Sequence, residues 1–373
     1  MPKVLFAGGG TAGHVNPALA IAEIIKEQYN DAEFLFAGTP NGIEANLIKK
    51  EGYEFAPIKV SGFQRKLTIK NIGRNIKSIY YLMLSTPRAK QIIKEFKPDL
   101  VIGTGGYVSG PIVMCATKMG IKTAIHEQNA FPGVTTKLLS KHVDKVMLTV
   151  EEAKKHLDPS FKYKVTGLPI RSAFSNITKS QARAELGIDN NICILSTGGS
   201  LGAGKINETV SDLIKWTTSE NMQINHIHSY GRMGKDTFLK SLEEKGVDLS
   251  NQRLYIKEYL NNMPTCMAAA DLVISRCGAN ALCELENMGR GSILIPSPIV
   301  AENHQYHNGM VLQNAGAGIV IEQKDLTSEL LIEKVKELCE DKKKLDLLSE
   351  NAKSLAISDT NERILKIIDE LLK

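Results

Sequence analysis

Two hydrophobic patterns alternate along the chain. Short apolar runs rich in β-branched residues predict strands, and segments with an apolar residue every third or fourth position predict helices. The expected strands are residues 3–7, 33–38, 55–60, 99–103, 123–126, 145–149, 163–167, 192–197, 224–229, 254–256, 272–275, 292–296 and 318–321. Because these runs are apolar almost throughout and are separated by helices, they predict parallel sheets covered on both faces.

The alternation pauses once, in a polar, proline-containing stretch at 157–176. It resumes at Thr178 with Gln181 three residues later, the spacing of a capping box at a helix start. We therefore expect the α/β class with two doubly wound domains, residues 1–168 and 169–357.

Capping residues predict two further helix starts. Asn16 and Pro17 fit the N-cap and first position of the first helix. From Thr327 onward the pattern is wholly helical, and Asp359 with Glu362 predicts a capping box for the last helix.

The first strand runs into a glycine loop, Gly8-Gly9-Gly10-Thr11-Ala12-Gly13-His14. Its spacing matches the dinucleotide fingerprint, in which glycines let an anion approach the helix amides. A dinucleotide site also needs a carboxylate near the end of the second strand, and none occurs before Glu44. An NAD-dependent oxidoreductase is therefore kept only as an alternative.

The second domain opens with a similar loop at 196–203. Residues 199–205 have the spacing of a P-loop, but Ile206 stands where the magnesium-binding Ser or Thr is required. A P-loop NTPase is therefore disfavoured. Two anion-binding loops on two domains suggest two phosphorylated partners facing one cleft.

Polar segments follow other predicted strands, where ligands of open parallel sheets bind. They are the glycine-rich 103–111, His126-Glu127-Gln128-Asn129, Arg276-Cys277-Gly278-Ala279-Asn280 with Glu284 one turn later, and 298–305.

Composition narrows the class of protein. The apolar fraction of 43% and the charged fraction of 23% are ordinary for a globular chain, and a net charge of +5 gives no reason to expect nucleic acid. The six cysteines form no CxxC pair, so we expect reduced thiols and no zinc site. The start of the chain has no signal-peptide pattern, and glycines and a proline interrupt the uncharged stretch 100–117, which argues against a membrane span.

Several segments, in order, resemble signatures of the MurG family of bacterial N-acetylglucosaminyltransferases: FAGGGTAGHVNPALA, GTGGYVSGP, HEQNAFPG, GLPIR, TGGSLGA, SRCGANALCE and AENHQ. The resemblance implies the GT-B fold, in which two Rossmann-like domains face a central cleft. It implies inverting transfer of GlcNAc from UDP-GlcNAc to the MurNAc of lipid I, which forms lipid II for peptidoglycan. The first domain would bind the acceptor and be joined by the last helix, 358–373, and the second would bind the donor.

The resemblance also implies a donor site. Glu284 would hold the ribose hydroxyls, Ser200 the pyrophosphate with Arg171 close by, and Gln305 the GlcNAc hydroxyls. The donor residues as a set are Thr11, Ala12, Gly13, Asn129, Arg171, Ser200, Leu260, Ala279, Asn280, Ala281, Leu282, Cys283, Glu284 and Gln305. The loops expected at the acceptor pyrophosphate hold Gly9, Gly10, Gly105, Gly106 and Tyr107.

The reaction needs a base for the acceptor hydroxyl and stabilisation of the leaving diphosphate. The chain has no Asp-x-Asp motif, so we expect no metal and no cofactor, with helix amides and Arg171 serving the diphosphate. His14 is the candidate base, since histidine changes charge near neutral pH. Glu127 is the alternative base, or a partner that orients His14; His14 could instead cap a helix or bind the acceptor.

A basic segment indicates where the protein works. Within 61–97 nine cationic residues stand against Glu95 alone: Arg65, Lys66, Lys70, Arg74, Lys77, Arg88, Lys90, Lys94 and Lys97. Beside apolar residues at helical spacing, this charge predicts an anionic membrane surface as a partner, on the cytoplasmic side of the cell membrane. A solvated basic face on a core-facing helix is the alternative.

Other function classes stay open. A sugar-nucleotide epimerase with the same paired domains and a non-catalytic nucleotide sensor are the further alternatives. Other cell-wall synthesis enzymes are candidate partners.

Overall fold

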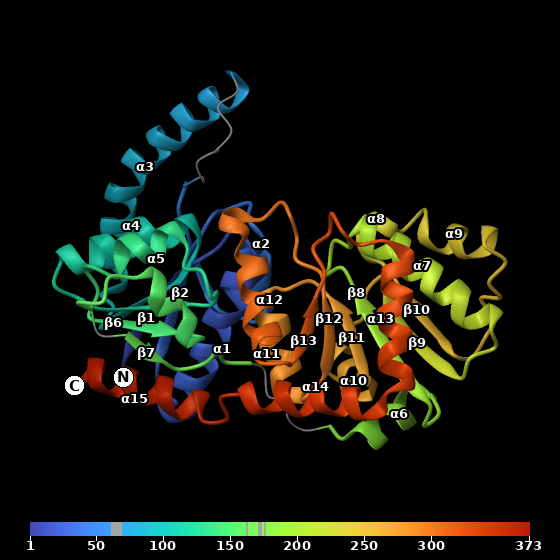
Figure 1. The fold of residues 1–373 in the computed structure, drawn as a ribbon. Coiled ribbons are helices and arrows are strands. Elements are labelled where there is room, and N and C mark those ends of the chain that lie inside the picture. Colours follow the sequence, from blue (N-terminus) through green and yellow to red (C-terminus); the bar gives the residue numbers. More distant parts are fainter. Residues whose placement is uncertain (61–68, 162, 171–173, 175–176) are drawn as a thin grey trace. The chain divides into compact units, whose positions relative to one another are not determined.

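The computed structural model describes residues 1–60, 69–161, 163–170, 174 and 177–373, with only the helical backbone at 69–80, 82 and 83. The chain forms two compact units. Unit 1 comprises Met1–Pro169 and Ile357–Lys373, and unit 2 comprises Ile170–Ala356. Both are α/β units built on parallel sheets (Figure 1), which confirms the predicted fold class.

Unit 1 contains a parallel sheet in the order β3-β2-β1-β4-β5-β6-β7. Its strands are β1 (Lys3–Gly8), β2 (Glu33–Gly38), β3 (Glu54–Pro57), β4 (Leu100–Gly105), β5 (Lys122–Glu127), β6 (Lys145–Leu148) and β7 (Tyr163–Val165). The chain moves outward from β1 in one direction, then returns beside it as β4, which places a topological switch point between these two strands.

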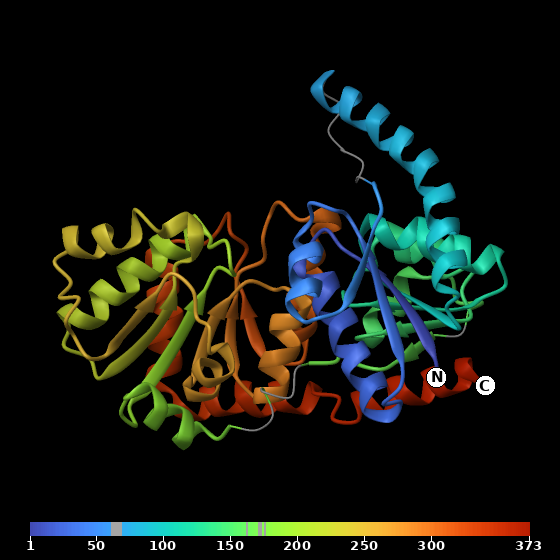
Figure 2. The ribbon, with the colours of Figure 1, turned by 180° about the vertical axis from the view of Figure 1, so that it is seen from behind.

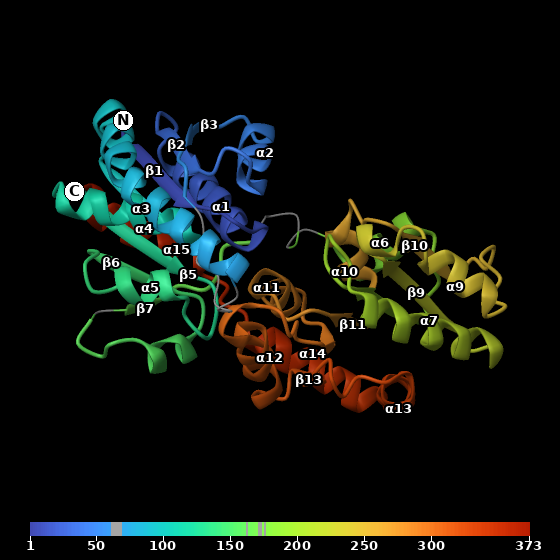
Figure 3. The same ribbon diagram turned by 90° about the horizontal axis from the view of Figure 1, so that it is seen from above.

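Helices cover both faces of this sheet, as Figure 3 shows from above. They are α1 (Ala12–Gln28), α2 (Ile43–Lys50), α3 (Ile69–Phe96), α4 (Gly106–Lys118), α5 (Val134–Leu139), the 3-10 turn η1 (Glu151–His156) and α15 (Thr360–Leu372). Successive strand residues alternate between the two cores: Val4 and Phe6 pack with α1, α2 and α15, whereas Leu5 and Ala7 pack with α3, α4 and α5. This is the two-layer covering that near-continuous apolar strands require.

Unit 2 repeats the plan with the order β10-β9-β8-β11-β12-β13. Its strands are β8 (Ile192–Thr197), β9 (Ile224–Ser229), β10 (Leu254–Lys257), β11 (Leu272–Ser275), β12 (Gly291–Leu294) and β13 (Gly318–Val320). Its switch point lies between β8 and β11.

The helices of unit 2 also form two layers. They are α6 (Lys179–Leu186), α7 (Gly204–Ser219), α8 (Gly231–Gly234), α9 (Phe238–Glu244), α10 (Met263–Ala269), α11 (Ala279–Met288), the 3-10 turn η3 (Ala301–Asn303), α12 (His304–Asn314), α13 (Ser328–Glu340) and α14 (Lys342–Leu355). Residues of α7, α9 and α13 share a core with Ile194 and Ile293, and residues of α6, α10, α11 and α12 share one with Leu195 and Leu294.

The final helix belongs to unit 1. α15 buries Ile364, Ile367, Ile368 and Leu371 in the core that contains α1. Lys145 pairs with Glu370 at 2.6 Å. Figure 2 shows both chain ends at the same end of this unit.

The helix starts differ in part from expectation. The capping box of Thr178 and Gln181 is confirmed at α6. The prediction for α1 was wrong: the helix begins at Ala12 with Thr11 as N-cap, and Pro17 lies inside it. Because proline has no N–H, Pro17 removes only the helical hydrogen bond to the Gly13 carbonyl, in the first turns of the helix. The predicted capping box at Asp359 was also wrong, because its carboxylate accepts from Arg363 Nε at 2.8 Å.

None of the helices in the described part of the chain has the length and apolar character needed to cross a membrane.

Candidate functional site

The switch point of each sheet gathers the segments that the sequence singled out. In unit 1, β1 ends at the 8–13 loop and its neighbour β4 ends at Gly105, opposite Gly8. In unit 2, β8 leads into the 198–203 loop, and its neighbour β11 leads into residues 276–280. Ligands of open parallel sheets bind at such carboxyl-end crevices.

A buried carboxylate fills the first glycine loop. Glu44, with no exposed surface, accepts from Gly10 N at 3.1 Å, from Thr39 N at 2.9 Å and from Thr39 Oγ1 at 2.6 Å. Burial works to raise the pKa of Glu44, but the hydrogen bonds from Thr39 and Gly10 outweigh it and hold the pKa below its ordinary value. An anion of the protein's own therefore occupies this loop.

This contact bears on Gly9 and Gly10, whose place at the acceptor pyrophosphate stays a prediction. A Cβ at Gly9 would stand 2.5 Å from Glu44 Oε1, so glycine is needed there to admit the carboxylate. The Gly10 amide is committed to Glu44 and is not available to an acceptor pyrophosphate. The same charge disfavours a dinucleotide pyrophosphate at this loop, which weakens the NAD-dependent alternative.

His14 lies against the glycine-rich segment that begins at the end of β4, within residues 103–111. A Cβ at Gly105 would be 2.6 Å from His14 Nδ1, and one at Gly106 would be 3.3 Å from its Cδ2. Both glycines have positive φ, 105° and 75°. Thr104 Oγ1 donates to the His14 carbonyl at 2.7 Å. Gly105 and Gly106 thus make room for the imidazole, and the Gly105 amide donates to Ser109 Oγ at 3.0 Å.

The partner of His14 is a residue to which sequence reasoning gave no role. The Nδ1 of His14 lies 3.2 Å from Oε1 of Gln128. In the sequence, Gln128 stood out only as one of four consecutive polar residues after a strand. The contact with His14 could not be predicted from local sequence, because the two residues lie 114 positions apart.

Glu127, the alternative base, is bound up in the loop that follows β5. It is 3% exposed, and its carboxylate accepts from Asn129 N, Asn129 Nδ2 and Gly133 N, each at 3.0 Å. Both oxygens are therefore engaged in fixing the loop after β5 and the Asn129 side chain. Gln128 has the orienting contact with His14 that had been considered for Glu127.

Around this centre, unit 1 presents residues that a ligand can reach. Thr11 and Gly13 are exposed, and Ala12 is half-buried at the start of α1. Tyr107 is 36% exposed, and its ring would meet a Cβ at Gly10 at 3.1 Å. Burial, and then the charge of Glu44, raise the pKa of Tyr107 against a lowering hydrogen bond with Thr39.

In the loop of unit 2, by contrast, no side chain of the described part of the chain fills the exposed tip, although Gly198 and Gly202 pack closely against backbone atoms. Ser200 is exposed, and a Cβ at Gly199 or Gly204 would meet no heavy atom of the described residues within 4 Å. The N-cap of α7 is Ala203, whose side chain cannot cap, and the first turn has no acidic residue. Lys205 in the first turn pairs with Glu208 at 3.0 Å. A helix start whose N-cap side chain makes no hydrogen bond is suited to a diphosphate.

The neighbouring strand supplies a second helix start. Gly278 is the N-cap of α11, and Glu284 lies half-buried along this helix. The Oδ1 of Asn280 is buried and has no hydrogen-bond partner in the described part of the chain, as expected of a group that awaits a ligand. Arg276 braces this region by donating to the carbonyls of Ile295 and Pro296, both at 3.2 Å.

The remaining donor residues differ in what they can offer. Gln305 accepts from Ser297 N at 2.8 Å, so its NH2 is the group available to a ligand. Leu260, Leu282 and Cys283 are buried, which leaves only their backbone groups. Ala279 and Ala281 are half-buried, and Arg171 lies outside the described residues.

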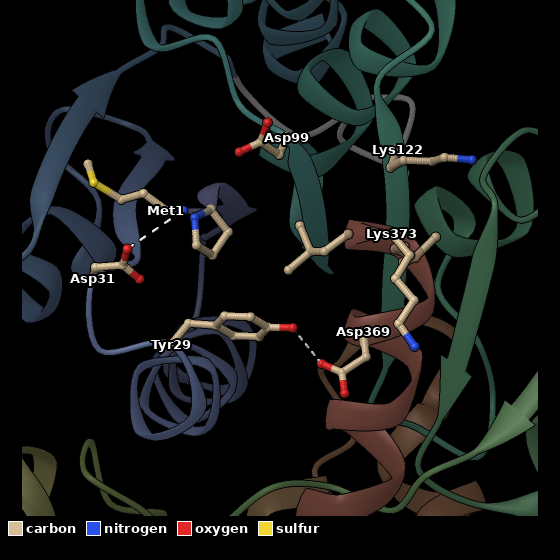
Figure 4. Close-up of a pocket in the computed structure, with 10 residues that line it drawn as sticks. Met1, Tyr29, Asp31, Asp99, Lys122, Asp369 and Lys373 are labelled. Carbon is tan, nitrogen blue, oxygen red and sulfur yellow. Dashed lines mark hydrogen bonds and ion pairs between the residues drawn. The ribbon is translucent and has the colours of Figure 1, made fainter.

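A cavity of about 600 Å³ lies at the amino-terminal ends of the strands of unit 1, away from the glycine loops (Figure 4). Met1, Asp99 and Lys122 line it near the amino ends of β1, β4 and β5. Some of its charges are already paired, as Met1 N with Asp31 at 3.6 Å, and ligand crevices form at carboxyl ends. We do not assign it to the site. Within the described residues no group of three or more His, Cys, Asp or Glu is placed to hold a metal ion.

Comparison with known proteins agrees with this architecture. Residues 4–148 match the glycosyltransferase family 28 N-terminal domain, and residues 193–364 match the family 28 C-terminal domain. The UDP-N-acetylglucosamine--N-acetylmuramyl-(pentapeptide) pyrophosphoryl-undecaprenol N-acetylglucosamine transferase of Acetivibrio thermocellus is 44% identical, covering 100% of this chain and 98% of its own. The transferase of the same name from Thermoanaerobacter sp. is 43% identical over 99% of this chain and 100% of its own.

Among solved structures, Acinetobacter baumannii MurG aligns with a TM-score of 0.78 and 26% identity over 99% of this chain and 100% of its own. The similarity thus extends over both units in sequence and in structure. The chain belongs to the MurG family of glycosyltransferases.

Proposed function

We propose that this enzyme transfers GlcNAc from UDP-GlcNAc to the MurNAc of lipid I and so forms lipid II. Full-length membership of the family supports the reaction. The observation that carries the donor assignment is the contrast between the two glycine loops. Glu44 fills the loop of unit 1, whereas in unit 2 the loop tip at Gly199 and Ser200 is exposed and the N-cap side chain of α7 makes no hydrogen bond.

The donor is assigned to unit 2 on this basis. Its diphosphate lies against the 198–203 loop with Ser200, and Arg171 assists. Glu284 receives hydrogen bonds from the ribose hydroxyls, and the backbone near Leu260 recognises the uracil edge. Asn280 Oδ1, buried without a partner in the described structure, accepts from a donor hydroxyl or amide. Gln305 donates its NH2 to the GlcNAc.

The acceptor is assigned to the switch point of unit 1. Tyr107 is exposed there. Thr11 and Gly13, also exposed, and Asn129, which Glu127 holds in place, are assigned to the sugar of the donor. The acceptor pyrophosphate uses hydrogen-bond donors other than the Gly10 amide, because that amide donates to Glu44.

The transfer is an inverting single displacement. The acceptor O–H bond breaks and its proton passes to His14, while the oxygen forms a bond to C1 of GlcNAc. The bond from C1 to the diphosphate oxygen breaks, and its electron pair leaves on UDP. The amides at the start of α7 stabilise that charge by about 0.3–2 kcal/mol. A general base contributes about 10²–10⁴-fold to the rate.

The site of action is the cytoplasmic face of the cell membrane, where the protein binds peripherally. The lipid-linked acceptor and the basic composition of 61–97 support this assignment. Figure 1 shows the amino-terminal part of α3, whose sequence includes Lys70, Arg74 and Lys77, extending away from the sheet of unit 1. Leu84 on α3 is 46% exposed.

The test is transfer of radiolabelled GlcNAc from UDP-GlcNAc to a short-chain lipid I analogue. We expect a labelled disaccharide product, and turnover that persists in EDTA. Turnover that EDTA abolishes and magnesium restores would contradict the metal-independent mechanism. Absence of product, together with epimerised sugar nucleotide when the acceptor is omitted, would replace the transferase with an epimerase.

A further inference from the structure

A continuous chain of hydrogen bonds within unit 1 ends at His14. The Nδ1 of His14 lies 3.2 Å from Gln128 Oε1. The Nε2 of Gln128 lies 3.2 Å from His126 Nδ1 and 2.8 Å from the His126 carbonyl oxygen. The Nε2 of His126 lies 2.9 Å from the carbonyl oxygen of Gly167. Each contact has a donor and an acceptor, and their order can be worked out from the far end.

The carbonyl of Gly167 can only accept, so His126 must carry a proton on Nε2. His126 is 1% exposed, and burial lowers its pKa, although the Gly167 contact and the Glu127 charge oppose this. The ring is therefore neutral at physiological pH and has one N–H. Its Nδ1 is then an acceptor, and Gln128 must donate to it.

The orientation of the Gln128 amide is fixed independently. The carbonyl oxygen of His126 can only accept, so the Gln128 atom 2.8 Å from it must be the NH2 group. The reversed amide would place two acceptor oxygens against each other there. The oxygen of the amide therefore faces His14, and Nδ1 of His14 must be the donor.

The imidazole of His14 is also held in place by the backbone beneath it. It lies so close to Gly105 and Gly106 that a Cβ at Gly105 would be 2.6 Å from Nδ1. Thr104 fixes the His14 backbone through its hydroxyl at 2.7 Å. The ring thus has both a fixed place and a fixed hydrogen-bond partner.

We infer that Gln128 and His126 are positioning residues that keep neutral His14 as the Nδ1–H tautomer, with the lone pair on Nε2. This rests on the proposed function, in which His14 removes the acceptor proton. Of the two ring nitrogens, only Nε2 can then receive the proton, and Nδ1–H goes on donating to Gln128 Oε1 as the ring becomes cationic. The amide oxygen of Gln128, an uncharged acceptor, stabilises the cationic ring through this hydrogen bond.

The primary test is nitrogen NMR of the full chain labelled with ¹⁵N-histidine, at about pH 8.5, above the ordinary range of histidine titration. The His14 signals are assigned by their loss in His14→Ala. We expect a protonated Nδ1 and an unprotonated Nε2. A protonated Nε2 with a bare Nδ1 overturns the inference, whatever the activity, and this measurement needs no substitution in the chain of hydrogen bonds.

The second test is Gln128→Leu, which removes the acceptor. Both tautomers of His14 should then be populated, and kcat should fall about tenfold or more, within the range that a general base supplies, while the KM for UDP-GlcNAc stays unchanged. The double variant His14→Ala/Gln128→Leu should lose no more kcat than His14→Ala, because Gln128 acts through His14. An unaltered tautomer and kcat in Gln128→Leu would contradict the proposal, as would fully additive losses.

Thr149→Val is the matched control. Thr149 Oγ1 donates to the Glu127 carbonyl at 3.0 Å and so supports the same segment without touching the chain of hydrogen bonds. Its tautomer signature and kcat should match wild type. If wild type shows the expected tautomer but transfers no GlcNAc, the proposed function fails and the tautomer assignment stands.

Discussion

Glu284 illustrates how a single side chain is expected to act in the donor site. We expect Glu284→Ala to weaken UDP-GlcNAc binding by about 1–3 kcal/mol, because it removes charge-assisted hydrogen bonds to the ribose. Calorimetric titration with UDP-GlcNAc measures this. Glu220→Ala, an exposed carboxylate at the far end of α7, is the control and should bind normally. Equal affinity in Glu284→Ala and wild type would remove Glu284 from the site.

Glu44 should matter for stability. Glu44→Gln replaces an acceptor-only group with one whose NH2 must face Gly10 N or Thr39 N, at a cost of about 1–3 kcal/mol at neutral pH. The folded-state pKa of Glu44 is lowered, so the wild-type advantage is present above the ordinary value and is lost as the pH falls through the folded pKa. Urea unfolding at several pH values checks this. A difference that persists at the lowest pH would contradict it.

At the scale of elements, β9 makes unit 2 sensitive to acid. His226 and His228 on this strand are almost fully buried. Burial lowers the pKa of His226 to about 4, and burial followed by the charge of His226 lowers that of His228 to about 3. The unfolded chain then binds more protons than the folded one below about pH 6.5, so stability falls with the pH by up to about 1.4 kcal/mol per pH unit for each histidine.

The measurement is urea unfolding of unit 2 between neutral pH and about pH 4. His226→Gln should flatten the dependence on pH, whereas His142→Gln, at an exposed histidine, should leave it as it is. An equally steep dependence in His226→Gln would show that other groups are responsible.

The helix α3 is the element expected to meet the membrane. Arg88 is a poor choice for testing this, because its Nε donates to the Pro57 carbonyl at 3.2 Å and docks α3 on β3. Lys90 and Lys94 are exposed on the same helix. We expect Lys90→Glu/Lys94→Glu to weaken binding to anionic vesicles, since each basic residue near such a surface contributes about 1 kcal/mol.

Sedimentation with anionic vesicles at two salt concentrations measures this binding, while transfer to a soluble acceptor should stay normal. Lys342→Glu/Lys343→Glu, at exposed positions of α14, makes the same change in net charge in unit 2 and should bind vesicles like wild type. Equal loss in both variants would mean that net charge alone governs binding.

For the molecule as a whole, the sequence predicted what depends on local pattern. Strands such as β2, β8, β9 and β11 begin and end where their apolar runs do. Contacts between distant residues were not predictable: Glu44 enters the first glycine loop across 34 positions and Gln128 meets His14 across 114. In unit 1 the loop glycines admit an internal carboxylate, whereas in unit 2 Gly198 and Gly202 allow close backbone packing and Gly199 faces open space.

The chain leaves unit 1 near Pro169 and returns to it at Ile357, so the two units should respond separately to core substitutions. Ile368 on α15 and Leu338 on α13 are both fully buried, in the cores of unit 1 and unit 2 respectively. Each change to alanine should cost about 2–5 kcal/mol through lost burial and a residual cavity. Hydrogen exchange by mass spectrometry follows the two units in one experiment.

In Ile368→Ala, exchange should accelerate in β1 and β5, and UDP-GlcNAc binding should be retained. In Leu338→Ala, it should accelerate in β8 and β12 instead, with weaker donor binding. This expectation follows because α15, although last in sequence, completes the core around α1 and Met147. If Ile368→Ala accelerated exchange in both units alike, the units would unfold as one body, and α15 would support more than the core in which it is buried.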